Sequence, residues 1–135
     1  MFVYKGDFYI AGTSSSQFSW WKNDIKQMQN SAGYSLSSIF VSNGNVYTCG
    51  YNTSYPNSIK WFKNSNIQTV LETILSHPSE AHSIYVYNKN VYIGGYETDS
   101  VSVAKVWKID ADNNITKYEV SSSGSTACSV YVTHD

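Results

Sequence analysis

Charged side chains are scarce in this sequence, and they do not gather into runs. Lys, Arg, Asp and Glu make up 14% of the 135 residues, against about 25% in average proteins. The net charge is −1, and there is no cluster of Lys or Arg. Nucleic acids and anionic membranes are bound by clustered positive charge, so we expect neither to be the main partner.

Long apolar stretches, a leader pattern and paired cysteines are also missing. No apolar run approaches the roughly 20 residues that span a bilayer. The opening residues Met1–Tyr4 contain neither a charged region nor the long apolar region of a signal peptide. Cys49 and Cys128 are the two cysteines, nothing in the sequence pairs them, and we expect buried free thiols. These observations favour an intracellular location.

Aromatic and β-branched residues are abundant instead, and they recur in a repeat. In Ile84–Tyr96, Ile and Val alternate with Tyr on both sides of a polar turn at Asn88–Asn90, which predicts a β-hairpin. Two earlier segments match this one without a gap, and the end of the chain repeats its opening. The copies are Met1–Gly12, Ile39–Gly50, Ile84–Gly95 and the shorter Val130–Val132.

Each hairpin is followed by an aromatic residue with a lysine after it, then by a polar turn and a fourth apolar run. The aromatic residues are Trp21, Phe62 and Trp107, and we expect them to pack between sheets. The fourth run of the second unit is ambiguous, because residues 68–76 fit either a strand through Thr73 or a short helix.

Each unit therefore predicts four short strands in about 40–45 residues, which is the period of a propeller blade. The chain resembles Kelch-like β-propeller repeats, in which an apolar run ends as in Gly94-Gly95-Tyr96 and an aromatic strand follows. This resemblance implies an all-β fold of four-stranded antiparallel blades in one repeat domain. The blades would span about residues 1–38, 39–83 and 84–129, with an orphan strand at 130–135.

Three blades are fewer than the four to eight of a closed propeller. An open arc would expose apolar blade faces, which mark an interface. We expect two copies to join head to tail in a six-bladed homodimer ring. Val130–Val132 of one copy would then lie near Met1–Tyr4 of the other, competing for one strand position or adding to it. The alternative is that the sequence belongs to a longer propeller.

Patterns for catalysis or metal binding are weak. Asp110–Asn114 imitates the start of a calcium loop, but Ile115 and Ser121 stand where glycine and glutamate are needed, which leaves a polar hairpin turn. The three histidines lack the spacing of a zinc site. We therefore predict no metal, no cofactor and no enzyme. A glycosidase pair of carboxylates assembled across blades is kept as an alternative.

Loops between the second and third strands of each unit are the candidate binding regions, because they vary while the scaffold repeats. Two of them open with tyrosine followed by two polar residues. The candidate ligand-binding residues are Tyr51, Asn52, Thr53, Tyr96, Glu97 and Thr98. Tyrosine can stack on a sugar ring while the polar groups bind hydroxyls, and a peptide would also fit. We predict a binding module for a protein or carbohydrate; the alternatives are a self-assembling structural unit and a glycan-active enzyme with a channel site.

Overall fold

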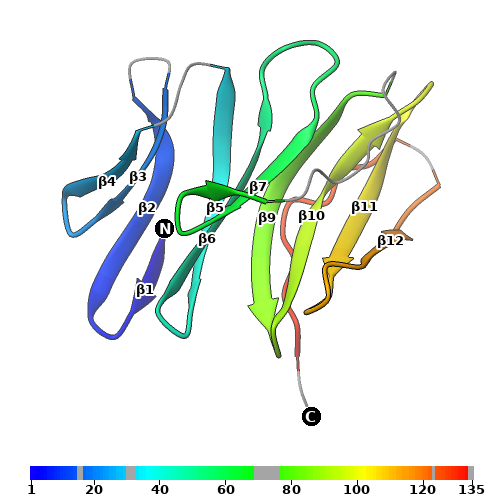
Figure 1. Cartoon of the computed structure of the whole chain (residues 1–135). Helices are drawn as coiled ribbons and strands as arrows, with labels where there is room; N and C mark the ends of the chain where they lie inside the picture. The colour runs from blue at the N-terminus through cyan, green and yellow to red at the C-terminus, as the bar shows by residue number, and fades with distance from the viewer. Residues whose placement is uncertain (15–16, 30–32, 69–76, 123, 134–135) are drawn as a thin grey trace.

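The chain forms three separate four-stranded antiparallel sheets that lie side by side (Figure 1). The structure is a computed structural model, and it describes residues 1–14, 17–29, 33–68, 77–122 and 124–133. None of these residues lies in a helix, so no helix among them could cross a membrane. The predicted all-β fold of four-stranded, blade-like sheets is confirmed.

Each sheet is a simple meander in which consecutive strands pair. The first sheet contains β1 (Phe2–Tyr4), β2 (Asp7–Ser14), β3 (Gln17–Lys22) and β4 (Ile25–Gln29). The second contains β5 (Tyr34–Ser42), β6 (Asn45–Asn52), β7 (Ile59–Lys63) and β8 (Asn66–Ile67). The third contains β9 (Ser79–Tyr87), β10 (Asn90–Thr98), β11 (Ser102–Ile109) and β12 (Ile115–Glu119).

The strand boundaries differ from the predicted blade boundaries. β5 and β9 begin at Tyr34 and Ser79, so the starts predicted at residues 39 and 84 fall inside these strands. The fourth strand of the second sheet is the short β8. The alternatives of strand and helix for residues 68–76 depend on positions 69–76, which lie outside the described residues.

Tight turns connect the first two strands of every sheet. The central turn residues are Lys5-Gly6, Asn43-Gly44 and Asn88-Lys89, and all six have positive φ. Two successive residues with positive φ make a type I′ turn, whose twist matches that of the two strands it joins. The predicted polar turn after Tyr87 is therefore confirmed, with Asn90 already the first residue of β10.

The core lies between the sheets, in two clusters. Phe62 of the second sheet packs in a cluster with Phe18 and Trp20 of the first. Trp107 of the third sheet, 2% exposed, packs in a cluster with Trp61 of the second. Each large aromatic side chain buries some 150–250 Å². The predicted inter-sheet role of the aromatic column is thus confirmed for Phe62 and Trp107.

Two glycines allow the first and second strands to approach closely. Gly50 and Gly95 lie opposite irregularities in β5 and β9. A Cβ atom at either position would overlap a backbone carbonyl oxygen of the paired strand, that of Ser35 or of Glu80. These positions therefore exclude every other residue type unless the backbone moves.

An aromatic ladder links the first strands of successive units. Ring centroids are 4.4 Å apart for Phe2 and Phe40, 4.6 Å for Phe40 and Tyr85, and 4.9 Å for Tyr85 and Tyr131. The last rung comes from the C-terminal segment, which has no sheet of its own. This segment therefore occupies the position that the first strand of a fourth sheet would take.

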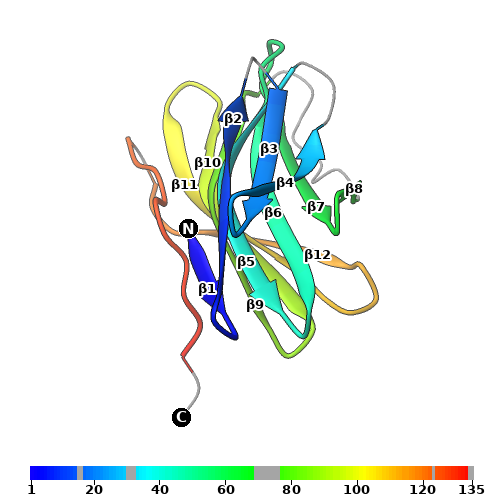
Figure 2. The same ribbon diagram turned by 90° about the vertical axis from the view of Figure 1, so that its left-hand side faces the viewer.

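A repeated hydrogen bond supports the same placement. The Ile84 amide donates to Ser38 Oγ at 3.3 Å, and the Val130 amide donates to Ser83 Oγ at 3.0 Å. Figure 2 shows the C-terminal segment (red) as an extended strip on the same side of the molecule as β1. Residues 130–133 are not part of a sheet, and the last two residues of the predicted orphan strand at 130–135 lie outside the described residues.

Candidate functional site

The predicted binding residues lie mainly at the ends of strands, not in loops. Tyr51 and Asn52 end β6, Tyr96, Glu97 and Thr98 end β10, and Thr53 directly follows β6. Successive residues of a strand point to opposite faces of the sheet. Tyr96 and Glu97 therefore cannot contact the same ligand from one face, which the sequence argument assumed.

Tyr96 hydrogen-bonds to the Glu80 carboxylate and lies near Tyr51, in what we call the Glu80 cluster. Burial first, and then the charge and hydrogen bond of Glu80, raise the pKa of Tyr96 to about 12, and the nearby Tyr51 adds to the shift. Asn57 Nδ2 donates to Glu80 Oε1 at 2.9 Å. The His82 ring stacks on Tyr96, with centroids 5.7 Å apart. The cluster thus joins the loop ends of the second and third sheets.

An open hollow of about 470 Å³ lies beside Tyr96. Val101, Ser102 and residues 124–126 form the rest of its lining. Ser102 is fixed at its rim by a 2.9 Å hydrogen bond between its hydroxyl and that of Thr98. Small-molecule sites commonly have volumes of about 300–1,000 Å³, so the hollow has the size of a binding site.

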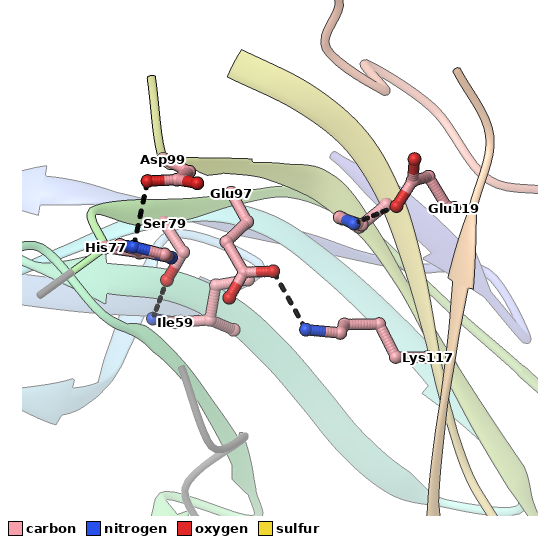
Figure 3. Close-up of polar contacts among 8 residues, drawn as sticks. Ile59, His77, Ser79, Glu97, Asp99, Lys117 and Glu119 are labelled. Atoms are coloured by element: carbon pink, nitrogen blue, oxygen red, sulfur yellow. Dashed lines mark hydrogen bonds and ion pairs between the residues drawn. The ribbon is translucent and has the colours of Figure 1, made fainter. Parts of the chain in front are cut away.

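Glu97 lies apart from this cluster, between the second and third sheets. Figure 3 shows its carboxylate beside Ile59 and Ser79 and pointing toward Lys117. Lys117 Nζ donates to Glu97 Oε2 at 2.9 Å, and Glu97 is buried. Glu97 Oε1 has no hydrogen-bond partner among the described residues. Glu97 is therefore a charge within the sheet interface.

The remaining predicted residues hold the loops in place. Asn52 Oδ1 accepts hydrogen bonds from the Ser58 amide and, at 3.1 Å, from the Ser58 hydroxyl. The amides of Thr53 and Thr98 each donate at 2.8 Å to the carbonyl of the residue just before the first strand of their own sheet. These bonds close the loop ends, and they position the tyrosines that precede them.

A contact between His77 and Asp99 ties down the loop after β10. His77 Nε2 lies 3.1 Å from Asp99 Oδ1, and it is drawn at the upper left of Figure 3. A second pair in the same view joins Lys105 to Glu119 at 2.6 Å. Both pairs belong to the third sheet or its flanks, so this sheet is the most highly charged part of the described fold.

Sequence reasoning missed Glu80 and His82, because it placed them in the tail of the second unit. The available signal was the hairpin register. Extending the Ile84–Tyr96 hairpin backwards, with one extra residue opposite the glycine pair, sets Glu80 opposite Tyr96. It also missed Tyr55, an exposed aromatic in the loop between β6 and β7.

The two cysteines differ in environment. Cys49 is fully buried, and burial raises the pKa of its thiol well above the ordinary value, so it is unreactive at neutral pH. Cys128 is exposed, because it lies on the surface segment after the third sheet, and the expectation of a buried thiol is wrong for it. Both are free thiols.

The Asp110–Asn114 segment is a hairpin turn, as predicted. The Asp110 carboxylate accepts hydrogen bonds from the amides of Asp112 and Asn114 and from Asn114 Nδ2, each at 2.9 Å. These bonds, with the side-chain bond to Asn114 first, lower the pKa of Asp110. Within the described residues, no three His, Cys, Asp or Glu side chains are grouped to hold a metal ion.

No protein-family model matches this chain, and no curated protein is similar to it in sequence.

Proposed function

We propose that this protein is a non-enzymatic binding module built from Kelch-like propeller blades, and that its ligand is a carbohydrate. The pairing of Tyr96 with Glu80, close to Tyr51 and with an open hollow beside Tyr96, supports this function. An aromatic ring offers a face for the apolar side of a sugar, while the Glu80 carboxylate and the Asn57 amide offer partners for hydroxyl groups.

The size and openness of the site favour a short glycan over a protein partner. The hollow beside Tyr96 has a volume of about 470 Å³, within the range of about 300–1,000 Å³ of small-ligand sites, whereas a protein interface is a broad surface that buries about 800 Å² on each partner. A few weak sites of this kind gain strength when several are linked. A dimer of the chain would supply such a linkage.

A glycan array with purified protein tests the proposal. We expect binding to a restricted set of glycans, and about tenfold weaker binding by Tyr96→Ala, which corresponds to about 1.4 kcal/mol. Glu80→Gln should weaken binding similarly, because it removes the negative charge of the cluster and replaces one acceptor oxygen with a donor. Tyr118→Ala, at a half-exposed tyrosine on β12, is the matched control and should bind normally.

Unchanged glycan binding by Tyr96→Ala would contradict this site. Release of sugar from a bound glycan would show instead a glycan-active enzyme. Binding of proteins but not glycans, lost in the same variant, would show a protein ligand.

A second function, self-assembly, is favoured by the outer face of the first sheet. Four equivalent positions lie on one face of each sheet. In the second and third sheets this face packs against the preceding sheet, and in the first sheet it is the outer face. The positions are Val3, Phe8, Ile10 and Trp21 in the first sheet, Val41, Val46, Thr48 and Phe62 in the second, and Val86, Val91, Ile93 and Trp107 in the third. All eight are buried in the second and third sheets, whereas Val3 and Ile10 of the first are 61% and 38% exposed.

A second copy of the chain is the occupant we propose for this face. In the second and third sheets, the equivalent positions are already covered by the preceding sheet. The third sheet of another copy would cover the first sheet in the same way. Two copies joined head to tail at both ends would close six blades into a ring. Tyr131 already occupies the ladder position that Phe2 of the next copy would take, so the two would compete there.

Light scattering tests the assembly. We expect a mass of twice 15.1 kDa for the wild type. Ile10→Asp should give a monomer, because it places a charge on the proposed interface. Ile25→Asp changes an exposed residue outside the four positions and should remain dimeric. A monomeric wild type at micromolar concentration would rule out self-assembly and leave the glycan proposal standing.

A further inference from the structure

The third sheet differs from the other two at its turn between the third and fourth strands. In the first two sheets this turn is Asn23-Asp24 or Asn64-Ser65, with positive φ at both residues. The asparagine side chain accepts from a backbone amide of the second strand, at 2.9 Å for Asn64. In the third sheet, Ile109 stands at the position of this asparagine and is the last residue of β11. The turn that follows, residues 110–114, is longer than the two-residue turns of the other sheets.

Because of this difference, one of two equivalent buried tryptophans has a hydrogen-bond acceptor and the other has none among the described residues. Trp20 of the first sheet donates from Nε1 to Ser65 Oγ, in the turn of the second sheet, at 3.3 Å. Trp61 occupies the equivalent position, since it pairs with Cys49 as Trp20 pairs with Ala11. Trp61 is 4% exposed, but its Nε1 has no acceptor among the described residues. A buried donor without a partner costs about 1–3 kcal/mol.

A cavity of about 390 Å³ lies at this place, between the second and third sheets. We call it the turn pocket. Its lining includes Tyr47, Trp61, Lys63, Lys89, Ile109 and Asp110. It is at the opposite end of the sheets from the Glu80 cluster, because turns between first and second strands and between third and fourth strands share one end of a meander. The longer turn of the third sheet thus leaves a cavity where the second sheet supplies Ser65.

The turn pocket combines the unpaired Trp61 indole with two exposed lysines. Lys63 and Lys89 form no ion pair with any described residue, and Lys63 Nζ lies 5.8 Å from the centre of the Tyr47 ring. The Asp110 carboxylate, the acid in the lining, already accepts three hydrogen bonds within its own turn. The pocket therefore offers one indole N–H and two ammonium groups to an acceptor that carries negative charge.

We propose that the turn pocket binds a small organic carboxylate, with one carboxylate oxygen accepting the Trp61 Nε1 hydrogen bond and Lys63 and Lys89 balancing the charge. The apolar wall formed by Tyr47 and Ile109 would contact the carbon skeleton of such a ligand. This site is independent of the glycan site and of the assembly face.

The indole N–H resonances in an NMR spectrum test this directly. The chain has four tryptophans, and Trp61→Phe identifies the Trp61 signal by its loss. Titration with succinate, against sodium chloride at matched ionic strength, should shift the Trp61 indole proton in a saturable way. The Trp20 indole proton should not shift, because Ser65 already accepts its hydrogen bond.

Three variants complete the test by calorimetry. We expect Trp61→Phe and the double variant Lys63→Gln, Lys89→Gln each to bind succinate at least tenfold more weakly than the wild type. Trp20→Phe is the matched control and should bind normally. The lysine variant changes polar positions at the pocket mouth, so it keeps the test informative if Trp61→Phe fails to fold.

Three outcomes would overturn the proposal: no saturable shift of Trp61 at millimolar succinate, equal affinity of the wild type and Trp61→Phe, or a shift produced by neutral glucose and not by succinate. A saturable shift lost in the lysine variant would support it.

Discussion

The two internal interfaces of this molecule have the same packing positions but different chemistry. Between the first and second sheets, Trp20 finds its acceptor in the Ser65 turn. Between the second and third sheets, the equivalent Trp61 has no acceptor among the described residues, and the buried Glu97 carboxylate lies inside the interface, paired with the partly exposed Lys117. The repeat therefore determines how the sheets stack, whereas the polar residues at the ends and rims of each interface differ without changing the stacking.

The largest effect should come from the aromatic column that both interfaces share. Trp107→Ala removes a fully buried ring and should lower the free energy of unfolding by about 3–5 kcal/mol. Trp21→Ala changes the same position on the outer face of the first sheet, where the ring is half-buried, and should cost less than half as much. Urea denaturation measures both. Equal losses would show that the outer face of the first sheet is also covered in solution.

Glycines at equivalent positions offer a second comparison of the sheets. Gly95→Ala should lower the free energy of unfolding by about 3 kcal/mol, because the new Cβ overlaps the Glu80 carbonyl oxygen. At Gly12 the nearest atom to such a Cβ is in the Trp21 ring, 3.7 Å away. Gly12→Ala should therefore be neutral or slightly stabilising. A similar loss in both variants, measured by thermal unfolding, would contradict the assigned strand register.

Two lysines of similar exposure test the charge inside the second interface. The Lys117 and Lys22 side chains are 39% and 41% exposed, but their partners Glu97 and Asp7 are 8% and 33% exposed. Lys117→Met leaves a buried carboxylate without its partner and should cost about 2 kcal/mol of stability. Lys22→Met should cause no measurable change, because water solvates the Asp7 carboxylate. Chemical denaturation at neutral pH would separate the two, and equal effects would contradict an interior role for Glu97.

The smallest effect concerns the Glu80 cluster at alkaline pH. The raised pKa of Tyr96, about 12, means that the fold favours its neutral phenol. This contribution to stability is complete below the unfolded pKa of about 10 and is lost as the pH rises through the folded pKa. Burial also raises the pKa values of Tyr47 and Tyr85, so the ultraviolet absorbance of tyrosinate should show several late ionisations in the wild type and one fewer in Tyr96→Phe. Glu80→Gln should move the Tyr96 ionisation to lower pH.

The architecture could be predicted because the repeat is written in local chemistry. Alternating Ile, Val and Tyr define the strands, and Asn88-Lys89 and its equivalents define the type I′ turns. These signals depend on neighbours in sequence. From these local signals, the three sheets and the buried positions of Phe62 and Trp107 were predicted correctly.

The candidate site could be predicted only in part, because it depends on contacts between sheets. Tyr51 and Tyr96 were found from their equivalent positions, but Glu80 meets Tyr96 through a strand register that includes an extra residue. Glu97 was assigned to the site from its sequence neighbour, although strand alternation turns it to the other face. The acceptor of Trp20 lies 45 residues away, so no local pattern could distinguish it from Trp61.

The bond between Val130 and Ser83, which copies the bond between Ile84 and Ser38, has a practical consequence for protein engineering. Residues 84–129 begin and finish at the same kind of junction. A gene carrying this segment twice in tandem should accept the additional copy without a newly designed contact surface, which would make blade number an adjustable parameter.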